Sequence, residues 1–155
     1  MRTWRRHSGF TLLELLVVLV IVGIMLGAVS FNAMPDERQR LENDARRIAL
    51  LLQLAREEAI VRNLPVAFEA DQFGYHFLVR EDRLWTPLKD DLLRQRSFQL
   101  SPVQLMIEPQ VSEDTATVRI IFGREPVDKP FILTMKSTGA TARIHADGIG
   151  HFSVD

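Results

Sequence analysis

The segment from Phe10 to Phe31 is a continuous apolar run that contains a single charged residue, Glu14. About 20 such residues, at ~1.5 Å of rise each in a helix, match the hydrocarbon thickness of a bilayer, about 30 Å. The run is therefore predicted to be a helix that spans a membrane. A carboxylate that faces lipid costs a few kcal/mol or more, so Glu14 is expected to have a cationic partner or a shallow position.

Basic residues before this run predict its orientation. Arg2, Arg5 and Arg6 have no acidic residue among them, and basic flanks stay on the cytoplasmic side of a membrane. The rest of the chain is therefore expected on the other side. Of the 155 residues, about 120 remain for one domain of modest size.

Composition argues against several classes of function. Three of the 19 basic residues and one of the 20 acidic residues lie at or before Phe31, which leaves a net charge of about −3 beyond it. A protein of this charge is not expected to bind nucleic acid. The chain has no cysteine, which excludes disulfides and thiolate metal sites. It also lacks a nucleophile elbow and a phosphate-binding glycine loop. We therefore expect that the protein is not an enzyme and that it has no catalytic residues, no cofactor and no small-molecule substrate.

The apolar run has two alternative interpretations. A secretory signal peptide would have small residues such as Ala28 and Ser30 at its cleavage site, but its apolar core is usually only ~7–15 residues long. An ordinary single-span anchor would leave Glu14 without a role, and intramembrane acids are rare.

The order Ser8-Gly9-Phe10-Thr11-Leu12-Leu13-Glu14 resembles the type III signal of type IV pilin-like proteins. This resemblance implies that a prepilin peptidase cuts between Gly9 and Phe10 and methylates the new amine of Phe10. Residues 1–9 are then a leader peptide, and residues 10–31 are the transmembrane and assembly half of the N-terminal helix.

In an assembled filament, Glu14 can pair with the new amine of a neighbouring subunit. Unlike charges a few Å apart attract by several kcal/mol even at an effective dielectric near 20, so this pair would penalise a wrong register. Gly23 and Gly27 form a G-x-x-x-G pair that permits close helix packing. A passive role for both glycines stays open, because glycine is common in membrane helices.

Residues 32–155 are predicted to form one domain, a helix to about residue 63 followed by strands. From Pro35 onward an apolar stripe at helical spacing predicts a face that packs on a sheet; Arg56 falls on the other faces and is expected to be solvated. Asn63, Leu64 and Pro65 end this helix, which is expected to continue the helix that starts at Phe10. The stripe is Leu41, Ala45, Ile48, Leu52, Ala55 and Ala59.

Short runs of strand-forming residues follow the helix. A helix followed by a run of strands predicts an α+β fold with antiparallel sheet. Asp147-Gly148 predicts a tight turn in the last hairpin. The predicted strands are Val66–Glu69, Tyr75–Val79, Arg83–Trp85, Val103–Glu108, Thr117–Phe122, Phe131–Lys136, Ala142–Ala146 and Ile149–Val154.

The helix end AREEAI and the tail RIHADGIGHFSV resemble H-type minor pseudopilins of the bacterial type II secretion system. This implies a pilin-like fold and a structural subunit at or near the tip of a periplasmic pseudopilus. The precursor would be a single-pass inner-membrane protein with a cytoplasmic N-terminus and a periplasmic domain. Its partners would be prepilin peptidase, other minor pseudopilins and the major pseudopilin. The alternative is a type IV minor pilin of similar fold, active in pilus assembly or DNA uptake.

A few other residues are candidates for binding roles. His145, Asp147 and His151 surround one hairpin, but their spacing fits no known metal site, so no metal is expected. DNA uptake would need clustered cations, and Arg80 with Arg83 and Arg94 with Arg96 are the nearest examples. Two aromatic residues, Trp85 and Phe98, are candidates either for partner contacts or for the core.

Overall fold

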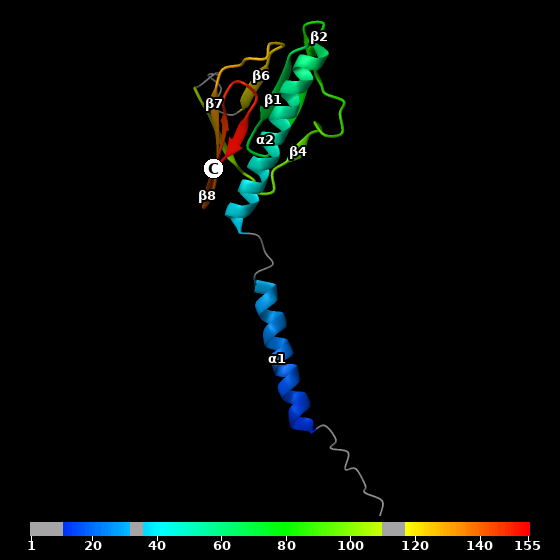
Figure 1. Cartoon of the computed structure of the whole chain (residues 1–155), viewed down its shortest axis with the longest axis vertical. Helices are drawn as coiled ribbons and strands as arrows, with labels where there is room; N and C mark the ends of the chain where they lie inside the picture. Colours follow the sequence, from blue (N-terminus) through cyan, green and yellow to red (C-terminus); the bar gives the residue numbers. More distant parts are fainter. Residues whose placement is uncertain (1–10, 32–35, 110–116) are drawn as a thin grey trace, which may run out of the picture. The chain divides into compact units, whose positions relative to one another are not determined.

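The computed structural model describes residues 11–31, 36–109 and 117–155. For residues 27–31 it describes the backbone only. The chain divides into two compact units, Met1–Pro35 and Asp36–Asp155. The first contains helix α1, Leu12–Phe31. The second contains helix α2, Glu37–Arg62, and all strands of the described residues (Figure 1). The predicted continuity of the two helices falls on residues 32–35, outside the described residues.

Helix α2 is amphipathic, and the predicted apolar stripe is its buried face. All six residues of that stripe are 0% exposed, so this prediction is confirmed. The helix also ends where predicted. Asn63 has a φ of 56° in the left-handed region, and the Leu64 N–H donates to the Ala59 carbonyl over 3.2 Å. This is the hydrogen bond that closes a Schellman motif.

The strands follow the sequence prediction except at two places. The short β4 lies outside the predicted strands, and β9 begins at Phe152 rather than Ile149. The strands are β1 (Val66–Ala70), β2 (Gly74–Glu81), β3 (Leu84–Pro87), β4 (Arg96–Ser97), β5 (Gln104–Glu108), β6 (Val118–Phe122), β7 (Phe131–Ser137), β8 (Ala140–Ala146) and β9 (Phe152–Val154).

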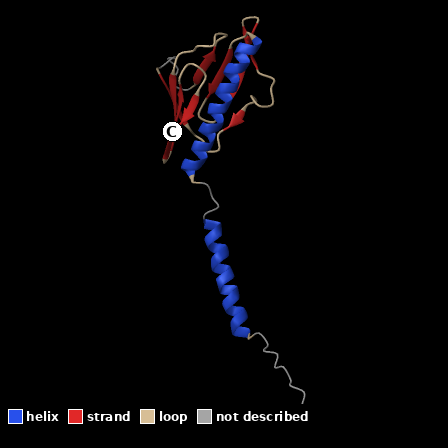
Figure 2. Cartoon of the chain, in the orientation of Figure 1, coloured by secondary structure: helices blue, strands red, loops and turns tan. Residues whose placement is uncertain are grey.

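The strands form two antiparallel sheets, as the α+β prediction requires. The first has the order β3-β2-β1-β6, with β4 paired to the beginning of β2, and the second has the order β5-β7-β8-β9. Helix α2 lies along the strands (Figure 2). Alternate residues of the strands point toward the helix and form the core. In β1 and β2 these include Phe68 and Phe77, whose ring centroids are 5.4 Å apart. The core of the described residues lies within Asp36–Asp155.

The last hairpin is wider than predicted. Ala146 pairs with Phe152, so residues 147–151 form the loop and His145 faces Ser153. The predicted two-residue turn at Asp147-Gly148 is therefore wrong. The wider loop is stabilised by the Asp147 carboxylate, which accepts hydrogen bonds from the N–H groups of Ile149 (2.8 Å) and His151 (3.0 Å).

Candidate functional site

Glu14 lies in the first turn of α1. Its N–H donates to the Thr11 carbonyl (3.0 Å) and lies 3.3 Å from Thr11 Oγ1, so Thr11 caps the helix. A carboxylate in this turn is favoured by the positive end of the helix dipole. The Glu14 side chain is exposed, and no ion pair joins it to another described residue. Its carboxylate is therefore accessible to a cation from another molecule.

The other predicted assembly residues are described only in part. Gly9 and Phe10 lie outside the described residues, and so do the surroundings of Gly27. At Gly23, an added Cβ would meet nothing within 4 Å in the same chain, so a second helix could approach closely there. Over the part of the chain that the structure describes, no helix is both long and apolar enough to cross a membrane.

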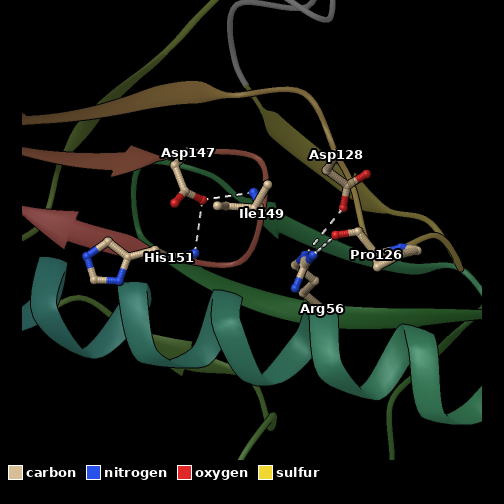
Figure 3. Close-up of polar contacts among 6 residues, drawn as sticks. All are labelled: Arg56, Pro126, Asp128, Asp147, Ile149 and His151. Atoms are coloured by element: carbon tan, nitrogen blue, oxygen red, sulfur yellow. Dashed lines mark hydrogen bonds and ion pairs between the residues drawn. The ribbon is translucent and has the colours of Figure 1, made fainter.

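Arg56 joins helix α2 to the loops of the domain. It is only 9% exposed, so the prediction that it is solvated is wrong. Its Nη2 donates to the Pro126 carbonyl, and its Nε lies 3.9 Å from Asp128 Oδ2 (Figure 3). Both partners belong to residues 123–130, which connect β6 of the first sheet to β7 of the second. The Pro126 carbonyl replaces water on one amino group of the buried guanidinium, and the Asp128 carboxylate offsets part of its charge.

Two glycines let the loop of residues 147–151 pack against Arg56 and against residues 126–130. Gly150 has a φ of 107°, and a Cβ there would overlap with Arg56 Nη1. Gly148 has a φ of 82°, and a Cβ there would overlap with the Asp128 carbonyl. The Asp128 N–H donates to the Gly148 carbonyl over 2.7 Å. Both positions favour glycine for backbone conformation. At Gly148 backbone atoms also leave no space for a Cβ, whereas at Gly150 a Cβ would displace the Arg56 guanidinium.

Asp128 and Asp147, one in each of these loops, have opposite pKa shifts. Burial raises the pKa of Asp128, and the nearby Arg56 guanidinium opposes this effect only in part. Arg56 Nε and Asp128 Oδ2 are buried without a hydrogen-bond partner in the described part of the chain, so the two groups interact through charge alone. The pKa of Asp147 is lowered, mainly because its carboxylate accepts the hydrogen bond from the Ile149 N–H.

The histidines and acids of the last hairpin make separate contacts. His145 Nε2 lies 2.7 Å from Asp155 Oδ1, whereas the Asp147 carboxylate is bound to backbone N–H groups of its own loop. Among the described residues, no cluster of three histidines or acids could hold a metal. The Arg56 cluster, which consists of Arg56, Pro126, Asp128 and Gly150, joins α2 to the connection between the sheets and to the last hairpin.

The remaining candidates of the sequence analysis have separate positions. Phe98 is buried in the core against Tyr75, with ring centroids 5.6 Å apart. Trp85 lies on the face of the first sheet away from α2. The centroid of its ring is 5.9 Å from Arg80 Cζ and 5.6 Å from Arg119 Cζ. In the sheet order, β3 and β6 are the outer strands, so the Trp85–Arg119 contact crosses β2 and β1.

The two arginine pairs of the sequence analysis do not form one cationic surface. Arg96 is opposite Tyr75 and Trp85 is opposite Arg80. These positions are about 17 Å apart along β2 at ~3.3 Å per residue. A phosphate backbone would need these cations to be clustered.

Two family models match the chain. Residues 4–30 match the prokaryotic N-terminal methylation motif, and this range contains Gly9, Phe10 and Glu14. Residues 44–150 match the type II transport protein GspH, and this range contains Arg56 and Gly150.

Curated relatives carry the name type II secretion system protein H. The protein from Aeromonas hydrophila is 36% identical over 92 residues, which cover 56% of this chain and 50% of the relative. The chain thus spans half the length of this relative. The protein from Pseudomonas aeruginosa is 26% identical over 141 residues, which cover 86% of this chain and 78% of the relative.

A solved structure has the same fold. The minor pseudopilin EpsH from the type 2 secretion system of Vibrio cholerae aligns with a TM-score of 0.58 and 19% identity, over 75% of this chain and 96% of that chain. This likeness confirms the predicted pilin-like α+β fold. Because the GspH match extends over more than half of the sequence, the chain belongs to the family of the type II transport protein GspH.

Proposed function

We propose that this chain is a minor pseudopilin, a structural and non-enzymatic subunit at or near the tip of a type II secretion pseudopilus. The observation that carries the proposal is the accessible carboxylate of Glu14 at the start of α1, in the same chain as a GspH-family domain. The methylation motif over residues 4–30 supports processing at Gly9 and Phe10.

In this proposal the leader is removed between Gly9 and Phe10, and the new amine of Phe10 is methylated. The apolar run from Phe10 to Phe31, which extends beyond the residues whose side chains the structure describes, keeps the precursor in the inner membrane as a single span, with the domain in the periplasm. On assembly, Glu14 pairs with the Phe10 amine of a neighbouring subunit. Because an unpaired carboxylate in lipid costs a few kcal/mol, the pair favours the correct register. The neighbours are other minor pseudopilins and the major pseudopilin.

The test separates processing from assembly. Glu14→Ala is expected to leave cleavage after Gly9 largely intact but to impair incorporation and secretion, whereas Gly9→Val is expected to block cleavage. Glu81→Ala removes an exposed carboxylate of β2 and serves as the matched control. The readouts are the mass of the mature N-terminus, co-isolation with the other pseudopilins, and the amount of exported protein. Normal incorporation and secretion by Glu14→Ala would refute the pairing.

A role in DNA uptake predicts a different measurement. A domain that captures DNA would bind it with strong salt dependence, because phosphate contacts release counterions. We expect residues 36–155 to show no such binding. Tight, salt-sensitive binding of duplex DNA would favour the minor pilin alternative over secretion.

A further inference from the structure

Helix α2 carries a second apolar stripe on the side away from the core. Leu50 is 70% exposed and Val61 is 80% exposed, and Leu54 between them is partly buried. Residues that follow one another at alternating intervals of four and three share one side of a helix and can form the seam of a coiled coil. We name this stripe the outer seam. It consists of Asn43, Arg47, Leu50, Leu54, Glu57 and Val61.

The two charged residues of the outer seam lack an opposite charge within the domain. Arg47 and Glu57 are exposed, and neither forms an ion pair with another described residue. Arg47 lies beside Tyr75, whose hydroxyl is neutral because burial raises its pKa. Glu57 accepts a hydrogen bond from the neutral amide of Gln53 over 3.1 Å. Both seam charges are therefore accessible to a partner of opposite charge.

The neighbouring acids of α2 do not neutralise Arg47. Asp44, one turn before it, is buried and accepts hydrogen bonds from the N–H and Nε2 of Gln99, over 2.8 and 3.1 Å. Two further acids have cations of their own at helical spacing: Glu42 contacts Arg38 and Arg46, and Glu58 contacts Arg62.

The outer seam is complementary to itself when its direction is reversed. Its residues form three pairs at equal distances from position 52: Leu50 with Leu54, Arg47 with Glu57, and Asn43 with Val61. In two antiparallel copies related by a twofold axis at this position, leucine meets leucine and arginine meets glutamate, each contact occurring twice by symmetry. In two parallel copies in register, Arg47 would meet Arg47 and Glu57 would meet Glu57, which is repulsive. The pattern therefore favours an antiparallel second copy of this chain.

We propose that two copies of this chain pair through the outer seams of α2, in antiparallel orientation and with the twofold axis at position 52. Leucines at the centre and charges toward the ends are the usual arrangement of a protein interface. A contact of one helix from each chain is small, so the pair is weak and exchanges readily. Because a twofold interface is closed and does not propagate, the pair is a state of the chain outside a filament. The inference thus goes beyond the proposed function.

The absence of cysteine allows a direct test of the orientation in the full-length chain. Asn43→Cys and Val61→Cys each introduce a single thiol and leave the leucines and charges of the outer seam intact. The two variants, with tags of different size, are made together in cells without the other pseudopilins, and a short bismaleimide is added. We expect adducts between Asn43→Cys and Val61→Cys chains. We expect none between two Asn43→Cys chains, because these thiols lie 18 residues, about 27 Å, apart along the antiparallel pair.

Substitutions in both thiol chains test the chemistry of the contact. Leu50→Asp is expected to lower the yield of the mixed adduct about tenfold or more, since the symmetry places two leucines at the centre of the interface. Arg47→Glu alone should also lower the yield, and the exchange of both charges, Arg47→Glu with Glu57→Arg, should restore it. Arg83→Glu, at the exposed turn between β2 and β3, is the matched charge reversal and should leave the yield unchanged. Thermal unfolding, expected to be unchanged for these exposed positions, separates loss of contact from loss of folding.

Several results would overturn the proposal. Adducts between two Asn43→Cys chains would show a parallel pair. Mixed adducts that form only when the other pseudopilins are present would assign the outer seam to a different partner. A complete lack of adducts, a normal yield with Leu50→Asp, or no rescue by the exchanged charges would each refute the antiparallel contact. The proposed function is tested separately by Glu14→Ala, because the pair does not use Glu14.

Discussion

Arg56 and Gly150 are expected to be energetically coupled, and the structure sets the size of the coupling. A methyl group at Gly150 meets the Arg56 guanidinium, and the φ of 107° disfavours any residue other than glycine. Gly150→Ala should therefore cost about 1–3 kcal/mol of backbone strain. It should also cost about 1–3 kcal/mol for the overlap with Arg56.

Arg56→Ala alone is expected to reduce the free energy of unfolding by about 2–4 kcal/mol. It removes a hydrogen bond from a charged donor to the Pro126 carbonyl, worth about 1.5–3 kcal/mol. It also leaves Asp128 without its cation, at a cost below the ~3–5 kcal/mol typical of a buried pair. The cost is reduced because the Asp128 side chain is 26% exposed and 3.9 Å from Arg56 Nε.

In the Arg56→Ala background, Gly150→Ala retains the backbone strain but loses the overlap. The double variant should therefore be about 1–3 kcal/mol more stable than the sum of the single changes predicts. The measurement is urea unfolding of residues 36–155, since the core of the described residues lies within this unit.

Gly148→Ala is the matched control. It introduces the same methyl group at a φ of 82°, but its close neighbours are backbone atoms of Asp128 and Pro130. Because Gly148 and Arg56 share Asp128 as a partner, some coupling is expected here too, but it should be smaller than at Gly150, where the added methyl group meets the Arg56 side chain itself. Additive behaviour of Gly150→Ala, or equal coupling at both glycines, would contradict the geometry described here.

Two further measurements test the electrostatics and the core. The pKa of Asp147 is lowered on folding. The charged carboxylate therefore stabilises the domain at pH values above its unfolded pKa of about 3.9. This stabilisation is lost as the pH falls through the lower pKa of the folded state. The difference in stability between the native chain and Asp147→Asn should therefore be present at pH 7 and disappear at acid pH; a constant difference in pH-dependent unfolding would refute this. Phe98→Ala should cost about 3–5 kcal/mol because Phe98 is a core residue. Trp85→Ala should cost less, because its ring is half-buried; equal losses in thermal unfolding would contradict these placements.

Much of the domain follows from local sequence patterns. The stripe from Leu41 to Ala59 predicts the buried face of α2, because apolar residues at helical spacing share one side of a helix. Asn63 and Pro65 predict its end. The strands from Val66 onward were predicted from β-branched and aromatic runs bounded by turn residues. These features depend on neighbours within a few residues.

Arg56 could not be placed by the same reasoning. A charged residue on a helix reads as solvated, and its burial depends on Pro126 and Asp128, about 70 residues away. The prediction of a tight turn at Asp147-Gly148 was wrong for a related reason. The loop widens around the Asp147 carboxylate and packs against Asp128, and a dipeptide rule does not contain these contacts. The sequence contains one usable signal: the loop begins with Asp147 and has glycines at positions 148 and 150.

The position of Trp85 has a spectroscopic consequence. The chain contains two tryptophans, Trp4 and Trp85, and cleavage after Gly9 would remove the first. The mature subunit would then have a single indole emitter, held between the guanidinium groups of Arg80 and Arg119. Its emission wavelength and its quenching by iodide would report on the outer face of the first sheet.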